Sequence, residues 1–136
     1  MKLFANIDGA SFGNPGKSGL GVVLKDSAGK VVREHSEHLG DGTNNRAEYL
    51  ALLRSIQLAR ESGADELEVS SDSELVVSQM NGVYRIKNRE LKTLAIMVND
   101  EIRKANLKFT IRHIPREMNS AADRLAKKGA DAFVPE

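Results

Sequence analysis

The sequence predicts an α/β fold in which helices flank one mixed, five-stranded sheet. The first third of the chain contains three segments with the two-residue period of strands, joined by short turns, as in antiparallel hairpins. In the remainder, two further strand-like segments alternate with helical ones, which is typical of parallel pairing. We therefore expect three antiparallel opening strands and two parallel ones, in the order β-β-β-α-β-α-α-β-α.

The opening strands are predicted from alternation and from turn residues. Residues 2–8 alternate with a period of two and carry apolar side chains on both faces, so a central strand is expected there. A turn-rich loop is expected at 9–16. Two more strands are predicted at 20–24 and 30–39, joined by a turn at 26–29.

The rest of the chain predicts alternating helices and strands. A helix is expected to begin at Thr43 or Asn45 and to stop at Gly63, because apolar residues recur between them with helical spacing. The remaining predicted elements are strands at 67–72 and 107–114 and helices at 74–80, 91–104 and 119–133.

Composition restricts the class of protein. The 136 residues suit one domain, 1–136, and 40% of them are hydrophobic and 29% charged, as in soluble globular proteins. The absence of cysteine from the sequence excludes disulfides, thiolate metal sites and cysteine nucleophiles. Because no apolar run has the length of a signal peptide or a bilayer span, we expect a cytoplasmic protein without a membrane partner. We also expect the protein to be a monomer. The net charge of +1 does not by itself indicate a polyanionic partner.

Four carboxylates occupy positions that folding could bring together. Asp8 and Asp72 each end a strand, and they meet if these two strands are parallel neighbours. Glu48 lies on the inward face of the first helix, and Asp123 borders the apolar face of the last one. Converging carboxylates repel one another, and hard divalent ions such as Mg²⁺ or Mn²⁺ are the usual remedy. Together these residues indicate a metal site.

Each carboxylate also has a structural interpretation. Residues 45–48 and 71–74 both fit a helix capping box. Asp123 lies one turn after a plausible Asn119 cap, where the helix dipole favours an anion. Either interpretation suits a single carboxylate, whereas the four together favour the metal site.

Four strings of residues resemble those of type 1 ribonuclease H, in the compact form common among archaea and some bacteria. They are DGASFGNPG at 8–16, TNNRAEYLAL at 43–52, SDSELVV at 71–77 and HIPREMNSAADRLAKKG at 113–129. The resemblance implies a ribonuclease H-like fold and an endonuclease that hydrolyses the RNA strand of RNA–DNA hybrids with two metal ions. It implies 5′-phosphate and 3′-hydroxyl products, with Asp8 bridging both ions, Asp123 completing one ion's site, and Glu48 and Asp72 holding the other ion.

The resemblance also implies contacts to the hybrid. Amide side chains both donate to and accept from the 2′-hydroxyl that distinguishes RNA from DNA. Loop and cap chemistry is the alternative explanation for these residues, and Glu74 stands where a number of relatives have glutamine. The matching positions are Gly13, Asn14, Thr43, Asn44, Asn45, Arg46 and Glu74.

Three other classes of function fit parts of the sequence. Residues 14–18 end like a phosphate-binding P-loop, which would indicate a nucleotide-binding ATPase or GTPase, but Ser11 replaces its first glycine and a strand-like segment follows. A binding module without catalysis would gain nothing from carboxylates beside a phosphate backbone. A nuclease of the same fold with another substrate, such as a junction resolvase, is the third class, and the asparagine-rich loops favour hybrids over it.

Overall fold

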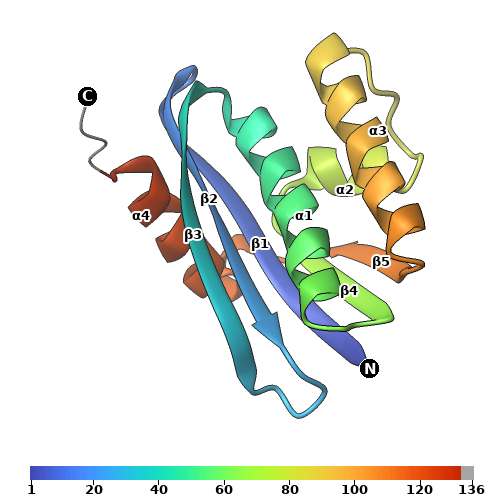
Figure 1. The fold of residues 1–136 in the computed structure, drawn as a ribbon. Coiled ribbons are helices and arrows are strands. Elements are labelled where there is room, and N and C mark those ends of the chain that lie inside the picture. Colours follow the sequence, from blue (N-terminus) through green and yellow to red (C-terminus); the bar gives the residue numbers. More distant parts are fainter. Residues whose placement is uncertain (133–136) are drawn as a thin grey trace.

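The computed structural model describes residues 1–132, which form one five-stranded sheet and four α-helices (Figure 1). The strands are β1 (Lys2–Gly13), β2 (Gly16–Lys25), β3 (Val31–Gly42), β4 (Glu66–Ser71) and β5 (Lys108–His113). The helices are α1 (Asn44–Glu61), α2 (Glu74–Met80), α3 (Arg89–Lys104) and α4 (Ser120–Ala130), with a short 3₁₀ turn at Arg116–Met118 before α4.

The sheet is mixed, with the strand order β3-β2-β1-β4-β5. β1 pairs with β2, and β2 with β3, in antiparallel fashion. β1 and β4, and likewise β4 and β5, are parallel neighbours. The predicted fold class and element order are therefore confirmed, including the parallel pairing of the first and fourth strands.

The first hairpin is longer than predicted. β1 continues to Gly13 and β2 begins at Gly16, so the loop predicted at 9–16 is wrong except for the turn at Asn14 and Pro15. Pairing runs from Phe4 opposite Lys25 to Gly13 opposite Gly16. Hydrogen bonding along both strands outweighs the turn tendency of the glycines, because tertiary context overrides local propensity in sheets. The P-loop interpretation is wrong for the same reason, since residues 16–18 belong to β2 and open no helix.

The last helix is shorter than predicted. α4 ends at Ala130, where the main chain turns at Asp131, and the predicted end at Phe133 lies outside the described residues. All the other predicted helices and strands are present. Within residues 1–132, no helix is both long and apolar enough to span a bilayer.

The two faces of the sheet are covered differently (Figure 1). One face packs against α1 and α2, and α3 packs in turn against α1, through a core of large aliphatic side chains such as Ile7, Leu52 and Ile56. The other face meets α4 through small residues. At Gly21 of β2, an added Cβ would lie only 2.3 Å from the carbonyl oxygen of Ala122, so glycine is required for this close approach. α4 therefore lies directly against the backbone of the central strands.

Candidate active site

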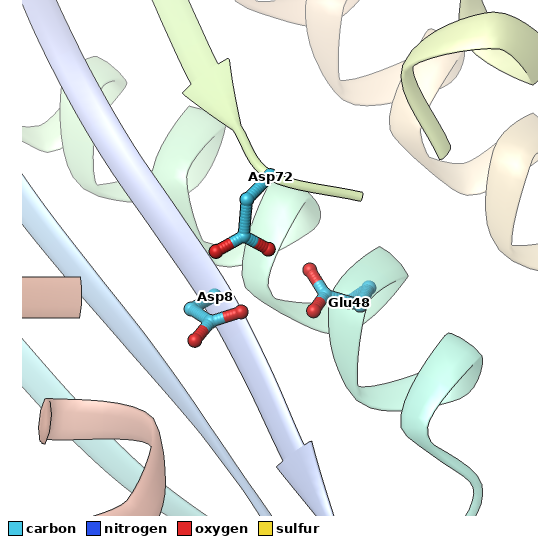
Figure 2. A group of neighbouring side chains, drawn as sticks. All are labelled: Asp8, Glu48 and Asp72. Carbon is cyan, nitrogen blue, oxygen red and sulfur yellow. The ribbon is translucent and has the colours of Figure 1, made fainter. Parts of the chain in front are cut away.

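Asp8 and Asp72 lie where two parallel neighbouring strands part. β4 pairs with β1 only as far as Ser71 opposite Ile7, whereas β1 continues to Gly13. From Asp8 onward, β1 has no paired strand on that side among the described residues, and Asp72 follows directly on the end of β4 (Figure 2). The site thus forms outside the carboxyl end of a parallel strand, as the sequence predicted.

Glu48 reaches the same place from the first turns of α1. Its side chain is 3% exposed, and the backbone of α1 at this point rests on β1 beside Gly9. A Cβ on Gly9 would lie 2.4 Å from the backbone nitrogen of Glu48, so any larger residue would push the helix away. The glycine that follows Asp8 therefore sets the distance between the two carboxylates.

Three carboxylates converge at this point (Figure 2). One oxygen from each of Asp8, Glu48 and Asp72 lies within 4.8 Å of the other two. Glu48 Oε2 is buried and has no hydrogen-bond partner in the part of the chain that the structure describes. A buried carboxylate oxygen without a donor is costly, and a cation bound among the three groups would remove that cost. An all-oxygen donor set of this kind fits a hard divalent metal ion.

Asp123 lies beside this group but has a cationic partner. Its Oδ2 is 3.0 Å from Nζ of Lys127, one helical turn later on α4, and its side chain is 25% exposed. The i,i+4 spacing brings this lysine to Asp123, so Lys127 offsets part of the negative charge of the four carboxylates. The other three carboxylates make no salt bridge within the described residues.

All four carboxylates line one open cavity of about 360 Å³. Two cationic side chains, Arg116 and Lys127, line it as well. The other side chains that line it include Ser11, Phe12, Asn44 and Ser73. The cavity therefore combines a group of carboxylates that could hold a metal ion with cations that can face a phosphate.

Burial and crowding shift the pKa values of these carboxyl groups. Burial raises the pKa of Asp8 to about 7, and the negative charges of Asp72 and Asp123 add to the rise. Burial also raises the pKa of Glu48 well above its usual value, with Asp8 as the second cause. For Asp123, burial acts in the same direction, but hydrogen bonds with Lys127 and Asp8 hold its pKa below the usual value. A bound cation would lower the raised pKa values, because it favours the ionised form.

The neighbouring helices are capped by other residues. Thr43 caps α1 and Ser73 caps α2, each by accepting a backbone N–H with its hydroxyl oxygen. The alternative interpretation of residues 45–48 and 71–74 as capping boxes is therefore wrong. Asn119 makes no side-chain cap to α4 either. Neither Glu48 nor Asp72 is needed to begin a helix, which removes their structural interpretation.

Five of the predicted hybrid contacts lie at the β1–β2 turn and the start of α1. Gly13 ends β1 and Asn14 begins the turn, and Asn14 Oδ1 accepts a hydrogen bond from the backbone N–H of Asn44 at 3.1 Å. Thr43 and Asn45 are exposed on either side of Asn44. Of these five residues, Asn44 alone lines the cavity.

Arg46 and Glu74 lie outside the cavity lining. Arg46 Nε is 3.9 Å from Glu90 Oε2, while its Nη1 is buried and finds no hydrogen-bond partner within residues 1–132. Glu74 begins α2, and its Oε1 accepts a hydrogen bond from the Tyr84 hydroxyl at 3.0 Å. The structure therefore groups Asn44 with the four carboxylates and places the other predicted contacts around them.

Sequence analysis did not place three residues, Lys127, Phe12 and Asn119, near the carboxylates. Lys127 follows Asp123 by four positions, and this helical spacing is a signal that could have identified the ion pair. Phe12 lines the cavity and is 50% exposed, which strand alternation does not reveal. Asn119 is buried and hydrogen-bonded to Asp72, a contact across 47 residues that leaves no local signal.

Comparisons with known proteins agree with this arrangement. Residues 6–129 match the family model described as "Reverse transcriptase-like". The chain is 35% identical to Ribonuclease HI of Halobacterium salinarum over 96% of its own length, and it spans 65% of that relative. It is 30% identical to Ribonuclease H of Ruegeria pomeroyi, covering 99% of this chain and 96% of the relative. The crystal structure of LC11-RNase H1 in complex with an RNA/DNA hybrid matches it with a TM-score of 0.90 and 38% identity, over 95% of this chain and 96% of that one.

Proposed function

Because this chain belongs to the ribonuclease H family, we propose that it is an endonuclease that hydrolyses the RNA strand of RNA–DNA hybrids. We assign 5′-phosphate and 3′-hydroxyl ends to the products and treat residues 1–136 as one catalytic domain that acts as a monomer. The observation that carries the proposal is the convergence of three carboxylates, two of them buried, in an open cavity. The fold around them is that of a relative solved with an RNA/DNA hybrid.

We assign the metal-binding and catalytic roles to Asp8, Glu48, Asp72 and Asp123. The unpartnered buried oxygen of Glu48 supports the first three, and the shared cavity supports Asp123. We propose Mg²⁺ or Mn²⁺ as the metal, with two ions in each site. When bound, such ions supply the positive charge that stabilises the attacking and leaving oxygens of an in-line displacement at phosphorus.

The chain's own residues hold the ions and orient the substrate. Asp8 must be ionised to bind a cation. Its pKa of about 7 allows this near neutral pH. Arg116 and Lys127 line the cavity and can offset the charge of the phosphates on either side of the cleaved bond. Asn44 can exchange hydrogen bonds with a ribose 2′-hydroxyl, because it lines the same cavity.

The other hybrid contacts are proposed for residues around the cavity. Asn14 is supported by its hydrogen bond to Asn44, which joins the β1–β2 turn to the start of α1. The remaining members of this set are Gly13, Thr43, Asn45, Arg46 and Glu74. We expect them to contact the sugar and phosphate groups that flank the cleaved residue.

Cleavage of labelled substrates tests the function. The purified protein is expected to cut an RNA–DNA hybrid with Mg²⁺ or Mn²⁺ and to leave double-stranded DNA intact. Failure to cut the hybrid with either ion would overturn the proposal, and cleavage of a four-way DNA junction in its place would favour the resolvase alternative.

Asp72→Asn tests the metal site within that function. The substitution removes a charged ligand at nearly constant volume, so we expect cleavage to fall by more than about 100-fold while the circular dichroism spectrum stays unchanged. Asp41→Asn is the matched control, because Asp41 is an exposed aspartate on β3 that does not line the cavity. An Asp72→Asn protein with most of its activity would remove Asp72 from the site.

A further inference from the structure

Asn119 is a buried asparagine, 1% exposed, that immediately precedes α4. Its side chain points away from the helix that it was expected to cap. Nδ2 donates to the carbonyl oxygen of Ile7 at 2.8 Å and to Oδ2 of Asp72 at 3.3 Å. Oδ1 accepts a hydrogen bond from Nδ2 of Asn6 at 3.1 Å. Both polar atoms of the amide are therefore engaged with the sheet and the site.

The backbone of Asn119 is also hydrogen-bonded to the backbone of Asp123, the residue that carries the fourth carboxylate. Its carbonyl oxygen accepts a hydrogen bond from the backbone N–H of Asp123 at 3.0 Å. Ile7, which accepts from the Asn119 amide, is the residue directly before Asp8. One buried residue thus contacts Asp72 directly and is joined to the backbone at Asp123 and next to Asp8.

We infer that Asn119 is a positioning residue for the metal site. It orients the carboxylate of Asp72, and it fixes the start of α4, which carries Asp123, against the ends of β1 and β4. The inference rests on the proposed function, because it takes Asp72 and Asp123 to be metal ligands. Residues that hydrogen-bond to a metal ligand orient it, and their loss typically lowers metal affinity or activity by about 10- to 100-fold.

The two hydrogen bonds that Asn119 Nδ2 donates distinguish this positioning role from a purely structural one. One proton is donated to a backbone carbonyl, and that bond alone would be enough to anchor α4. The second proton is donated to Asp72, where it restricts rotation of the carboxylate and occupies one acceptor position of Oδ2. An anchor for the helix does not need this second bond, whereas a ligand that must present its oxygens in one direction does.

Metal binding without substrate tests the inference directly. Mn²⁺ is titrated into the wild-type protein and into Asn119→Ala by calorimetry, and the rise in Tm on adding Mn²⁺ is measured in parallel. We expect Asn119→Ala to bind Mn²⁺ about 10- to 100-fold more weakly. In cleavage assays, its half-saturating Mg²⁺ concentration should rise by a similar factor, with much of kcat recovered at saturating Mg²⁺. Equal Mn²⁺ affinity in the two proteins would overturn the inference.

Ser36→Ala is the matched control for loss of an α4 anchor. The Ser36 hydroxyl donates to the carbonyl oxygen of Leu125 in α4 at 2.6 Å and contacts none of the four carboxylates. We expect Ser36→Ala to lower Tm but to leave Mn²⁺ affinity unchanged. If it weakens Mn²⁺ binding as much as Asn119→Ala does, attachment of α4 explains the effect and the positioning role is refuted.

Asn6→Ala keeps the test decisive if Asn119→Ala does not fold. Nδ2 of Asn6 donates a hydrogen bond to Oδ1 of Asn119. Asn6→Ala removes this bond and leaves both hydrogen bonds from Asn119 Nδ2 in place. We expect a smaller loss of Mn²⁺ affinity in the same direction, and no loss would overturn the inference. Cleavage by the wild type tests the proposed nuclease function separately from the role of Asn119. If the wild type cuts hybrids and the Asn119 variants bind Mn²⁺ normally, only the positioning role is refuted.

Discussion

Asp8→Asn is expected to stabilise the metal-free protein at alkaline pH. Burial raises the pKa of Asp8 from 3.8 to about 7, so the folded protein holds a proton that the unfolded chain releases. For an acid with a raised pKa, this contribution to stability is fully present below the unfolded pKa and is lost as pH rises through the folded one. Near pH 8 the wild type must therefore ionise a buried carboxyl group, whereas asparagine stays neutral.

The size of the effect follows from the two pKa values. The difference between 3.8 and about 7 corresponds to about 4 kcal/mol of unfolding free energy. This is an upper limit, because Glu48 shares the site and the proton can reside on either carboxyl group. For a chain of this size, 1 kcal/mol shifts Tm by about 3–4 °C, so Tm should rise by up to about 16 °C.

Thermal unfolding followed by circular dichroism measures this shift. In chelator, the Tm of Asp8→Asn should exceed that of the wild type near pH 8, and the two should converge at about pH 4, where both side chains are neutral. Saturating Mg²⁺ should reduce or reverse the difference, since the wild type binds the ion more tightly. The exposed Asp41→Asn control should show no such pH dependence. An Asp8→Asn protein no more stable than the wild type in chelator near pH 8 would refute the account of a crowded, buried carboxyl group.

Three further predictions follow from the site. Gly9→Ala should cost about 1–3 kcal/mol in urea unfolding and should slow cleavage, because the new Cβ would lie 2.4 Å from the Glu48 nitrogen; an unchanged urea midpoint would contradict the close approach. The half-saturating Mg²⁺ concentration for cleavage should fall as pH rises through about 7, since protons compete with the metal for Asp8; a flat profile would count against Asp8 as a ligand. Lys127→Ala should change stability by less than about 0.5 kcal/mol, because the pair is partly exposed, but should raise the pKa of Asp123 in an NMR titration of the metal-free protein, since the ammonium group that favours its ionised form is lost. An unchanged Asp123 pKa would contradict the ion pair.

The carboxylate group could be predicted because its geometry follows from general rules of sheet architecture. The alternation of helices and strands implies that the strands of Asp8 and Asp72 are parallel neighbours; in the structure Asp8 lies where β1 loses its pairing with β4, and Asp72 follows the end of β4. Glu48 could be placed from helical periodicity alone. These inferences need only the order and period of the elements, which the sequence carries directly.

The errors arose where a local pattern has two physical outcomes. The string at 9–16 is rich in glycine and suits a loop, but glycine also permits the close strand pairing that continues to Gly13. Asn119 precedes a helix and suits a cap, but the approach of α4 to the sheet offers its amide better partners in Ile7 and Asp72. Which outcome prevails depends on contacts between distant segments, and no window of sequence contains both sides of those contacts.

The two faces of the sheet contribute differently to thermal stability and to catalysis. The large aliphatic core belongs to α1, α2 and α3, while α4 is held by small residues and by polar bonds such as the one from Asn119 Nδ2 to the Ile7 carbonyl oxygen. Substitutions in the first layer change how much heat the molecule withstands. Substitutions between α4 and the sheet can move the carboxylate of Asp123 slightly and leave the rest of the fold intact. Turnover in such an enzyme can therefore be changed by substitutions on the α4 face of the sheet, without changing the aliphatic core that stabilises the fold.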